Sequence, residues 1–264
     1  MHKLRQLTRS LRGRLLLSMV AMVVLPLTAA TVLAVRSSRG AVESSLGTAR
    51  GFVADNAANW LDRIVYERTV EIQALGSNVE LATAVMGMGD SVATRAVLAG
   101  VQERNRVTDG VLLYDAAGAL VAANTPQELA SAEPSAAGAA WFREALAAGR
   151  PTYVGPVERA PDGKLRVRMA DAVRSASGEN LGAVVMDLDW QRVTDAVVGY
   201  TERSYARKSG GTRRLRAYIV DPAGKVVGST RPADVFRVSL AGSGALRGLG
   251  SGRSGALVED VPGL

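Results

Sequence analysis

The chain has 264 residues, a formal net charge of +7 and a hydrophobic content of 47%. That hydrophobic content predicts a folded chain rather than a disordered one. There is no cysteine, and the only histidine is His2, which excludes Ser-His-Asp and Cys-His nucleophile systems and His-based metal sites from the rest of the chain.

An uncharged apolar run of 21 residues, Leu15 to Val35, follows the N-terminal tail. Its length matches the roughly 30 Å hydrocarbon core of a bilayer. Five basic residues and no acidic residue precede it, which predicts a cytoplasmic tail at residues 1–14 and places residues 36–264 outside the cell membrane. A cleaved signal peptide is the alternative, but its apolar region is only about 7–15 residues long, so we predict a retained transmembrane helix at residues 15–35.

The positive charge is concentrated at this membrane segment. Residues 1–39 hold seven basic residues and no acidic one, whereas residues 40–264 hold 25 of each. A nucleic-acid-binding domain would carry its basic charge on a folded face. We therefore expect the lipid bilayer, and not nucleic acid, as a partner.

Two helices are predicted after the membrane segment. From residue 37 to residue 78, apolar side chains recur at steps of three and four, with charged residues mostly between them, as in an amphipathic helix. About 40 residues at 1.5 Å each would form a stalk of about 60 Å. A second helix is predicted at residues 91–106, so that residues 36–106 form the stalk helix and the second helix.

Short strands and helices are predicted over residues 107–200, which indicates an α+β module. Asp115 to Gly118 supplies the turn chemistry of a hairpin between two apolar runs. A short helix is expected at residues 137–148, and three strands connected by Gly-containing turns favour an antiparallel meander. The remaining predicted elements are strands at 111–114, 119–122, 152–158, 165–173 and 181–188, a helix at 190–205 and a loop at 207–214.

The first hairpin recurs 106 residues later. Five identities over sixteen positions relate the two copies: Asp115/Asp221, Ala117/Ala223, Gly118/Gly224, Val121/Val227 and Pro126/Pro232. Two copies at domain-sized spacing predict two copies of one small module. Fewer than 40 residues follow the second hairpin, so we expect the second module, residues 201–264, to be incomplete.

A further pattern starts at Trp141-Phe142 and continues through Tyr153-Val154-Gly155 to a strand that ends in Asp187-Leu188. In this order it resembles the double-Cache (dCache) sensor region of bacterial transmembrane receptors, over roughly residues 15–235. The resemblance implies a transmembrane helix that continues into the stalk helix and two PAS-like antiparallel-sheet (Cache) modules. Residues 107–200 would be membrane-distal and residues 201–264 membrane-proximal.

The resemblance also implies a function. The distal module would bind a small-molecule ligand outside the inner (plasma) membrane, and a homodimer would transmit the signal through the stalk. A methyl-accepting chemotaxis receptor is the leading expectation, and the input region of a sensor histidine kinase or diguanylate cyclase is the alternative. A membrane-anchored structural protein without a ligand is a further alternative. No enzymatic activity, cofactor or metal is expected within these 264 residues.

Ligand-binding residues are carried over from the amino-acid-binding subset of this family. Trp141, Phe142, Tyr153 and Asp187 stand at matching positions; the resemblance implies that the aromatic residue after the Trp, here Phe142, lies beside the ligand carboxylate, and that the Tyr-x-Asp motif and Asp187 lie beside its amine. Aromatic side chains also anchor helices on sheets, so a purely structural role for Trp141 and Phe142 is equally compatible with the pattern.

Two positions depart from that pattern. Ala139 stands where the family has an arginine, and Gly155 stands where it has an aspartate. Without the guanidinium there is no bidentate carboxylate clamp, which argues against an amino-acid ligand and leaves Asp187 to face a cationic or polar group. Arg166 and Arg168 share one face of a strand; Arg168 is a candidate ligand contact, although solvated charges on a strand are commoner.

Overall fold

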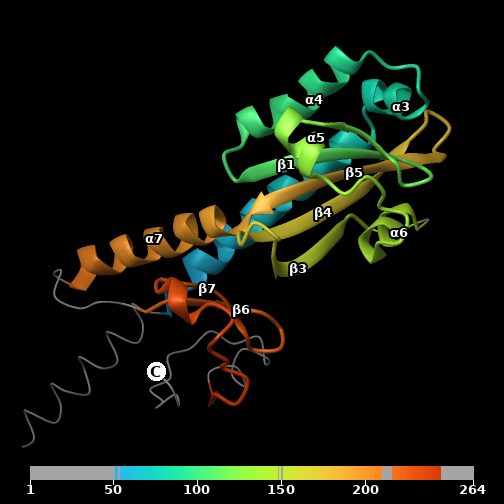
Figure 1. Ribbon diagram of the computed structural model, residues 1–264. Helices are drawn as coiled ribbons and strands as arrows, with labels where there is room; N and C mark the ends of the chain where they lie inside the picture. Colours follow the sequence, from blue (N-terminus) through green and yellow to red (C-terminus); the bar gives the residue numbers. More distant parts are fainter. Residues whose placement is uncertain (1–50, 53, 148, 150, 210–215, 245–264) are drawn as a thin grey trace, which may run out of the picture. The chain divides into compact units, whose positions relative to one another are not determined.

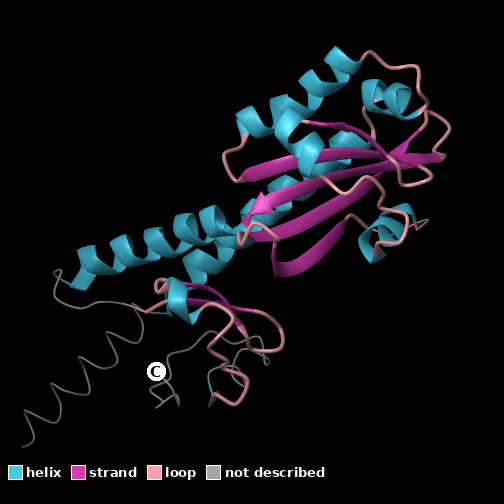
Figure 2. Cartoon of the chain, in the orientation of Figure 1, coloured by secondary structure: helices cyan, strands magenta, loops and turns pink. Residues whose placement is uncertain are grey.

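The computed structural model describes residues 51–52, 54–147, 149, 151–209 and 216–244 (Figure 1). The fold is α+β with an antiparallel sheet (Figure 2), as predicted. The expected cytoplasmic tail and transmembrane helix lie outside the described residues. Within the described part of the chain, no helix has both the length and the apolar character that a membrane span requires.

Among the described residues, three helices precede the sheet. Residues 54–76 form the first one, in agreement with the amphipathic pattern. It ends where Gly76 lies so close to a strand of the sheet that a Cβ atom there would be 2.5 Å from the carbonyl oxygen of Ala172. The chain then starts α3 (Val79–Val85), for which Asn78 is the N-cap. The predicted second helix is confirmed as α4 (Ser91–Arg104).

Five antiparallel strands form the main sheet, in the order β2-β1-β5-β4-β3. The predicted hairpin and the predicted meander are both confirmed; four strands lie within one residue of their expected bounds, and β1 begins three residues earlier than predicted. The strands are β1 (Thr108–Asp115), β2 (Leu120–Ala123), β3 (Tyr153–Arg159), β4 (Leu165–Arg174) and β5 (Asn180–Asp189).

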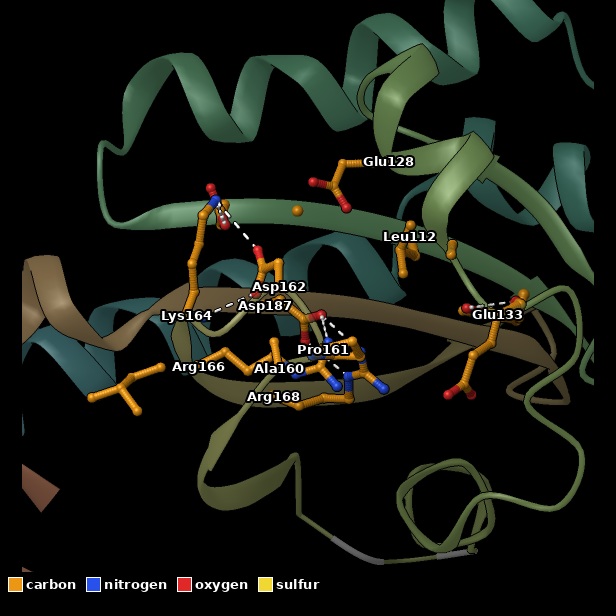
Figure 3. Close-up of a pocket in the computed structure, with 15 residues that line it drawn as sticks. Leu112, Glu128, Glu133, Ala160, Pro161, Asp162, Lys164, Arg166, Arg168 and Asp187 are labelled. Carbon is orange, nitrogen blue, oxygen red and sulfur yellow. Dashed lines mark hydrogen bonds and ion pairs between the residues drawn. The ribbon is translucent and has the colours of Figure 1, made fainter. Parts of the chain in front are cut away.

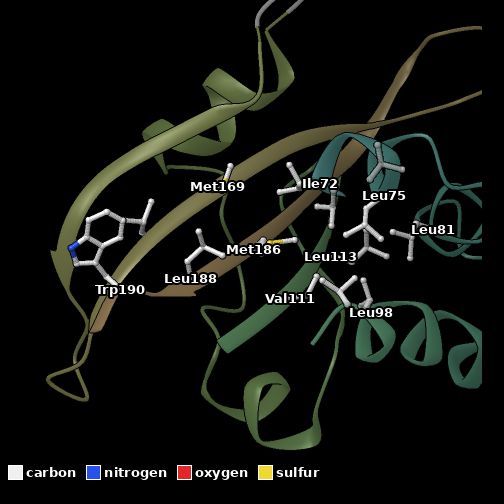
Figure 4. Close-up of a cluster of buried hydrophobic side chains, with 14 of the residues drawn as sticks. Ile72, Leu75, Leu81, Leu98, Val111, Leu113, Met169, Met186, Leu188 and Trp190 are labelled. Carbon is white, nitrogen blue, oxygen red and sulfur yellow. The ribbon is translucent and has the colours of Figure 1, made fainter. Parts of the chain in front are cut away.

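Alternation of side chains along the strands divides the sheet into two faces. On one face, large apolar side chains of β1, β4 and β5 share a cluster with those of the preceding helices (Figure 4). Each such side chain contributes about 1.5–3 kcal/mol when it leaves water. The cluster includes Ile72, Leu75, Leu81, Leu98, Val111, Leu113, Met169, Met186 and Leu188.

The opposite face of the sheet carries α6 (Ala140–Leu146) and α5 (Pro126–Ser131). Trp141 and Phe142 of α6 are buried there with Leu112 and Tyr114 of β1. α6 is shorter than the predicted helix at 137–148. α5 was not predicted, since six residues do not show a helical period; Thr125 accepts the backbone hydrogen bond of Glu128 at its start.

α7 (Trp190–Ser209) follows β5 directly. Asp189 accepts the backbone N–H of Arg192 at 3.0 Å, which satisfies a free donor of the first turn. The predicted loop at residues 207–214 is wrong for residues 207–209, which belong to α7 and include no glycine or proline. Residues 210–215 lie outside the described residues.

The second copy of the hairpin is formed by β6 (Tyr218–Val220) and β7 (Val226–Ser229), which pair antiparallel. A 3-10 helix, η1 (Pro232–Asp234), follows. The repeated sequence unit therefore has a repeated structure.

Candidate functional site

A cavity of about 250 Å³ lies on the sheet face that carries α5 (Figure 3). Leu112, Tyr114, Arg168 and Asp187 reach it from the strands, because β1, β4 and β5 present alternate residues to this face. The helix α5 and the turn between β3 and β4 supply the remaining walls: Glu128, Ala132, Glu133, Ala160, Pro161 and Asp162, with Asp109, Gly110, Lys164, Leu165 and Arg166 at the adjoining strand ends.

An arginine–aspartate pair forms the base of the cavity. Arg168 and Asp187 stand directly opposite each other on β4 and β5, and two hydrogen bonds of 2.8 and 2.7 Å join Nε to Oδ1 and Nη2 to Oδ2. Both side chains are only 14% exposed. Burial lowers the pKa of Arg168, but the hydrogen bonds and charge of Asp187 outweigh it, so the pKa is raised and the guanidinium stays charged.

Aromatic side chains support this pair. The guanidinium carbon of Arg168 lies 5.3 Å from the centre of the Trp141 ring, a cation–π geometry. Trp141 in turn contacts Tyr114 and Phe142 edge to face, with ring centres 5.7 Å apart in each case. The contact with the Trp141 ring therefore stabilises the position of the Arg168 guanidinium.

Acidic side chains surround the other end of the cavity. Lys164 Nζ lies 3.0 Å from Asp109 and 3.8 Å from Asp162, and its pKa is raised by the hydrogen bond to Asp109. Glu128 extends from α5 over β1, where its Oε2 would lie 3.0 Å from a Cβ atom at Gly110. Burial raises the pKa of Glu128, and the charges of Asp109 and Asp187 raise it further.

Two of the five residues expected to bind a ligand line the cavity, namely Arg168 and Asp187. Trp141 and Phe142 are buried next to it, and Tyr153 packs at the edge of the same apolar cluster. Neither aromatic residue of α6 lines the cavity itself. Trp141 therefore affects the cavity through its contact with Arg168.

Several lining residues were missed by sequence reasoning. Asp109 and Glu128 carry no motif, and Asp162 lies in one of the predicted Gly-containing turns, between the strands at 152–158 and 165–173. A residue's place on this cavity depends on how α5 and the β3–β4 turn close over the sheet. Only the sequence Thr125-Pro126 before Glu128, which is typical of a helix N-terminus, could have indicated that Glu128 lies on a short helix.

The cavity offers charged and hydrogen-bonding groups around apolar side chains, which suits binding of a small polar molecule. Within the described residues, no group of three or more His, Cys, Asp or Glu side chains is placed to hold a metal ion.

No protein-family model matches the chain, and no curated protein matches it in sequence. Solved structures are nevertheless similar to it. The ligand-binding domain of the amino acid chemoreceptor PctC of Pseudomonas aeruginosa PAO1, in complex with GABA, has a TM-score of 0.52 and 22% identity, over 74% of this chain and 80% of that chain.

Two further structures match at similar scores. The ligand-binding domain of the Campylobacter jejuni chemoreceptor Tlp3, in complex with L-norvaline, has a TM-score of 0.53 and 12% identity, over 74% of this chain and 71% of that one. The sensor domain of the V. cholerae histidine kinase DctB has a TM-score of 0.51 and 18% identity, over 70% of this chain and 66% of that one. At these identities the similarity concerns the fold: the chain has the fold of the ligand-binding sensor domains of chemoreceptors and of a histidine kinase, which confirms its resemblance to a double-Cache sensor region.

Proposed function

We propose that this chain is the ligand-sensing, extracytoplasmic region of a bacterial transmembrane signal-transduction receptor. The observation that carries the proposal is the cavity of about 250 Å³ on one face of a sensor-type sheet, with the buried Arg168–Asp187 pair at its base. Cavities that combine apolar walls with a few convergent polar groups are the usual small-molecule sites.

The proposed organisation follows the sequence analysis. Residues 1–14 are the cytoplasmic tail, 15–35 cross the inner membrane, 36–106 form the stalk helix and the second helix, 107–200 the distal module, and 201–264 the proximal module. The recurrence of one hairpin in β1–β2 and β6–β7 supports the division into two modules.

A route for the signal is provided by side chains that join the first helix to the sheet. Gln73 of that helix donates to the hydroxyl of Thr152 at 3.0 Å, and Thr152 donates to Asp171 of β4 at 2.9 Å. Ligand binding would favour one packing of sheet on helix, to the extent that its affinity differs between the two packings. A homodimer through this helix would carry the change towards the membrane.

A chemotaxis receptor is the output we favour, supported by the fold matches to PctC and Tlp3. The match to DctB supports a histidine kinase as the alternative.

Sensing is tested by thermal shift on the purified 264-residue chain with a panel of amines, organic acids and nucleobases. We expect at least one compound to raise Tm. Gly110→Leu, which places a side chain under Glu128, should abolish the shift. Gly138→Leu is the matched control, because a Cβ atom there has no neighbour within 4 Å. If no compound raises Tm, the chain is better described as a structural membrane-anchored protein.

A further inference from the structure

One wall of the cavity is formed by the segment between β3 and β4, residues 160–164. This segment supplies Ala160, Pro161, Asp162 and Lys164 to the lining (Figure 3). Two backbone hydrogen bonds close it into a turn: Gly163 donates to the Ala160 carbonyl and Ala160 donates to the Lys164 carbonyl, each at 2.8 Å. The turn therefore moves as a unit, and its position relative to the sheet determines the shape of the cavity.

Two side-chain contacts hold this turn. Lys164 Nζ lies 3.0 Å from a carboxylate oxygen of Asp109 on β1, and both residues line the cavity. Arg159, the last residue of β3, donates from Nη1 to the Gly163 carbonyl at 2.7 Å. Arg159 is not a lining residue, so it acts on the cavity through the turn.

The Arg159 guanidinium also contacts the second module. Its central carbon lies 5.8 Å from the centre of the Phe236 ring, within the range of about 6 Å over which an arginine is attracted to an aromatic face. Lys225, in the turn between β6 and β7, lies over the same ring, with Nζ 4.6 Å from its centre. Phe236 is half-buried and packs against the main apolar cluster. One guanidinium therefore contacts both the cavity wall and the second module.

The backbone at Phe236 is strained. Its φ is 63°, and it is the only residue other than glycine with a positive φ in the described part of the chain. A bulky side chain rarely adopts this conformation, which persists only where the surrounding structure compensates for its cost. The Phe236 N–H donates to the Val226 carbonyl of β7 at 2.8 Å. This hydrogen bond and the two cation contacts supply the compensation, so the placement of the ring and the contact with Arg159 depend on each other.

From these contacts we infer that Arg159 is a positioning residue for the cavity and that Phe236 couples it to the second module. The second module then sets the position of the cavity wall. A ligand that displaces the wall changes the packing of the second module in return, because coupling between two sites is reciprocal. The inference rests on the proposed sensing function and adds a route for the signal besides the one through the first helix.

Hydrogen exchange on the purified 264-residue chain tests this coupling without a ligand. Phe236→Leu keeps an apolar side chain but removes the ring, so exchange of residues 160–164 should become about threefold faster, as expected for the loss of an exposed cation–π contact. Phe236→Tyr keeps the ring and should leave that exchange at the wild-type rate. The rescue by tyrosine distinguishes the contact with Arg159 from simple filling of space.

Arg159→Ala removes the same contact from the side of the first module. It also removes the hydrogen bond to Gly163, so residues 160–164 should exchange faster than in Phe236→Leu. The double variant should exchange no faster than Arg159→Ala alone, because Phe236 acts on the turn through Arg159. Arg95→Ala, which removes an exposed arginine of α4, is the matched control and should leave the turn unchanged.

Ligand affinity provides a second readout. For each compound of the panel of amines, organic acids and nucleobases that raises the Tm of the wild type, the affinity is measured by isothermal titration calorimetry. A wall that is no longer held in place must be ordered on binding. Phe236→Leu and Arg159→Ala should therefore bind these compounds more weakly than the wild type, whereas Phe236→Tyr should bind them equally well.

Three results would overturn the inference: unchanged exchange of residues 160–164 in Phe236→Leu, a double variant that exchanges faster than Arg159→Ala, or equal ligand affinity in the wild type and Phe236→Leu. If Phe236→Leu unfolds the second module, which would appear as rapid exchange throughout residues 218–229, the comparison of Arg159→Ala with Arg95→Ala decides. If no compound of the panel binds, the sensing function fails, and the exchange measurements still decide whether the second module positions the turn.

Discussion

The two hairpins of this chain have the same turn but are stabilised in different ways. In the first, Asp115 accepts the backbone N–H of Ala119 at 2.8 Å; in the second, Asp221 accepts that of Lys225 at 2.8 Å. Gly118 has a φ of 80° and Gly224 a φ of 81°, which glycine adopts without steric cost.

The likeness continues beyond the repeated sequence. In each copy a later segment returns to the hairpin: Pro134 accepts from Leu120 at 3.1 Å, and Val238 accepts from Val226 at 3.0 Å. The offset between these acceptors is 104 residues rather than 106. The connection is therefore two residues shorter in the second copy, where η1 replaces the longer α5.

The difference lies in what covers each hairpin. β1 pairs with β5 in the middle of the five-stranded sheet, whereas β6 and β7 form a sheet of two strands within the described residues. A two-stranded hairpin is marginally stable alone. Val227 is 4% exposed, while its counterpart Val121 is 37% exposed, and the Trp190 indole donates to the Val227 carbonyl at 2.9 Å.

The first hairpin is thus held by its own module, and the second is held by packing on α7 of the first. Two hairpins with the same turn residues can therefore differ in stability. The turn determines the local backbone geometry, whereas burial of apolar side chains supplies most of the free energy of folding.

Leu113→Ala should have the largest effect of the substitutions considered. Leu113 is fully buried in the core of β1, so its truncation should cost about 2–5 kcal/mol of unfolding free energy. Because the second hairpin depends on the first module, hydrogen exchange should show loss of protection in residues 218–229 as well. Retained protection there would contradict the dependence that we describe.

Val227→Ala is the reciprocal change. It removes apolar contact where the second hairpin packs on α7, so it should expose residues 218–229 to exchange while β4 and β5 stay protected. Equal loss of protection in both regions would show that the two hairpins unfold as one unit.

Trp190→Phe should have a smaller effect. The substitution keeps an aromatic ring but removes the indole N–H, which leaves the buried Val227 carbonyl without that donor and costs about 1–3 kcal/mol. We expect the loss to appear as faster exchange in β7 and as a lower urea midpoint. Tyr66→Phe, which removes a polar group from an aromatic side chain that is 67% exposed, is the control and should leave exchange in β7 unchanged.

Much of this arrangement could be predicted from the sequence. The strands were found because apolar runs of four to eight residues are bounded by turn residues such as Asp115–Gly118 and Pro161–Gly163. Both hairpins were found for the same reason. α5 was not, since short helices depend on tertiary packing more than on their own pattern, and the last three residues of α7 were assigned to a loop.

The site was less predictable than the fold. Arg168 and Asp187 could be named because alternation places them on one sheet face and the family pattern marks the second. Asp109 and Glu128 could not, because they meet only when α5 closes over β1. No local sequence pattern predicts that α5 lies over β1. A turn, by contrast, can be predicted from four consecutive residues.

Asp115→Ala and Asp221→Ala test how much each turn contributes to the stability of the chain. Each removes one side-chain hydrogen bond to the backbone, and each should cost about 0.5–1.5 kcal/mol locally. Only Asp115→Ala should shift the midpoint of global unfolding, because its hairpin belongs to the main sheet. Equal shifts in Tm for both variants would contradict this expectation.

Glu128→Gln and Asp234→Asn should give the smallest changes in stability, and of opposite sign. The two acids occupy equivalent positions, 106 residues apart, but Asp234 accepts the Tyr218 hydroxyl at 3.2 Å, whereas Glu128 faces the cavity beside Leu112. Asp234→Asn exchanges a charged acceptor for a neutral one and should lower Tm slightly. Glu128→Gln removes a carboxylate that is harder to ionise in the folded chain, because folding raises its pKa, and should raise Tm slightly.

The pH dependence separates the two cases further. Because folding raises the pKa of Glu128, the folded state binds the proton more tightly than the unfolded state does. The stabilisation from this group is complete below the ordinary glutamate pKa, about 4.3, and is lost as pH rises through the raised value. Wild type should therefore lose stability relative to Glu128→Gln as pH rises through that window, as measured by Tm at each pH. A constant difference would mean that Glu128 ionises as readily in the folded chain as in the unfolded one.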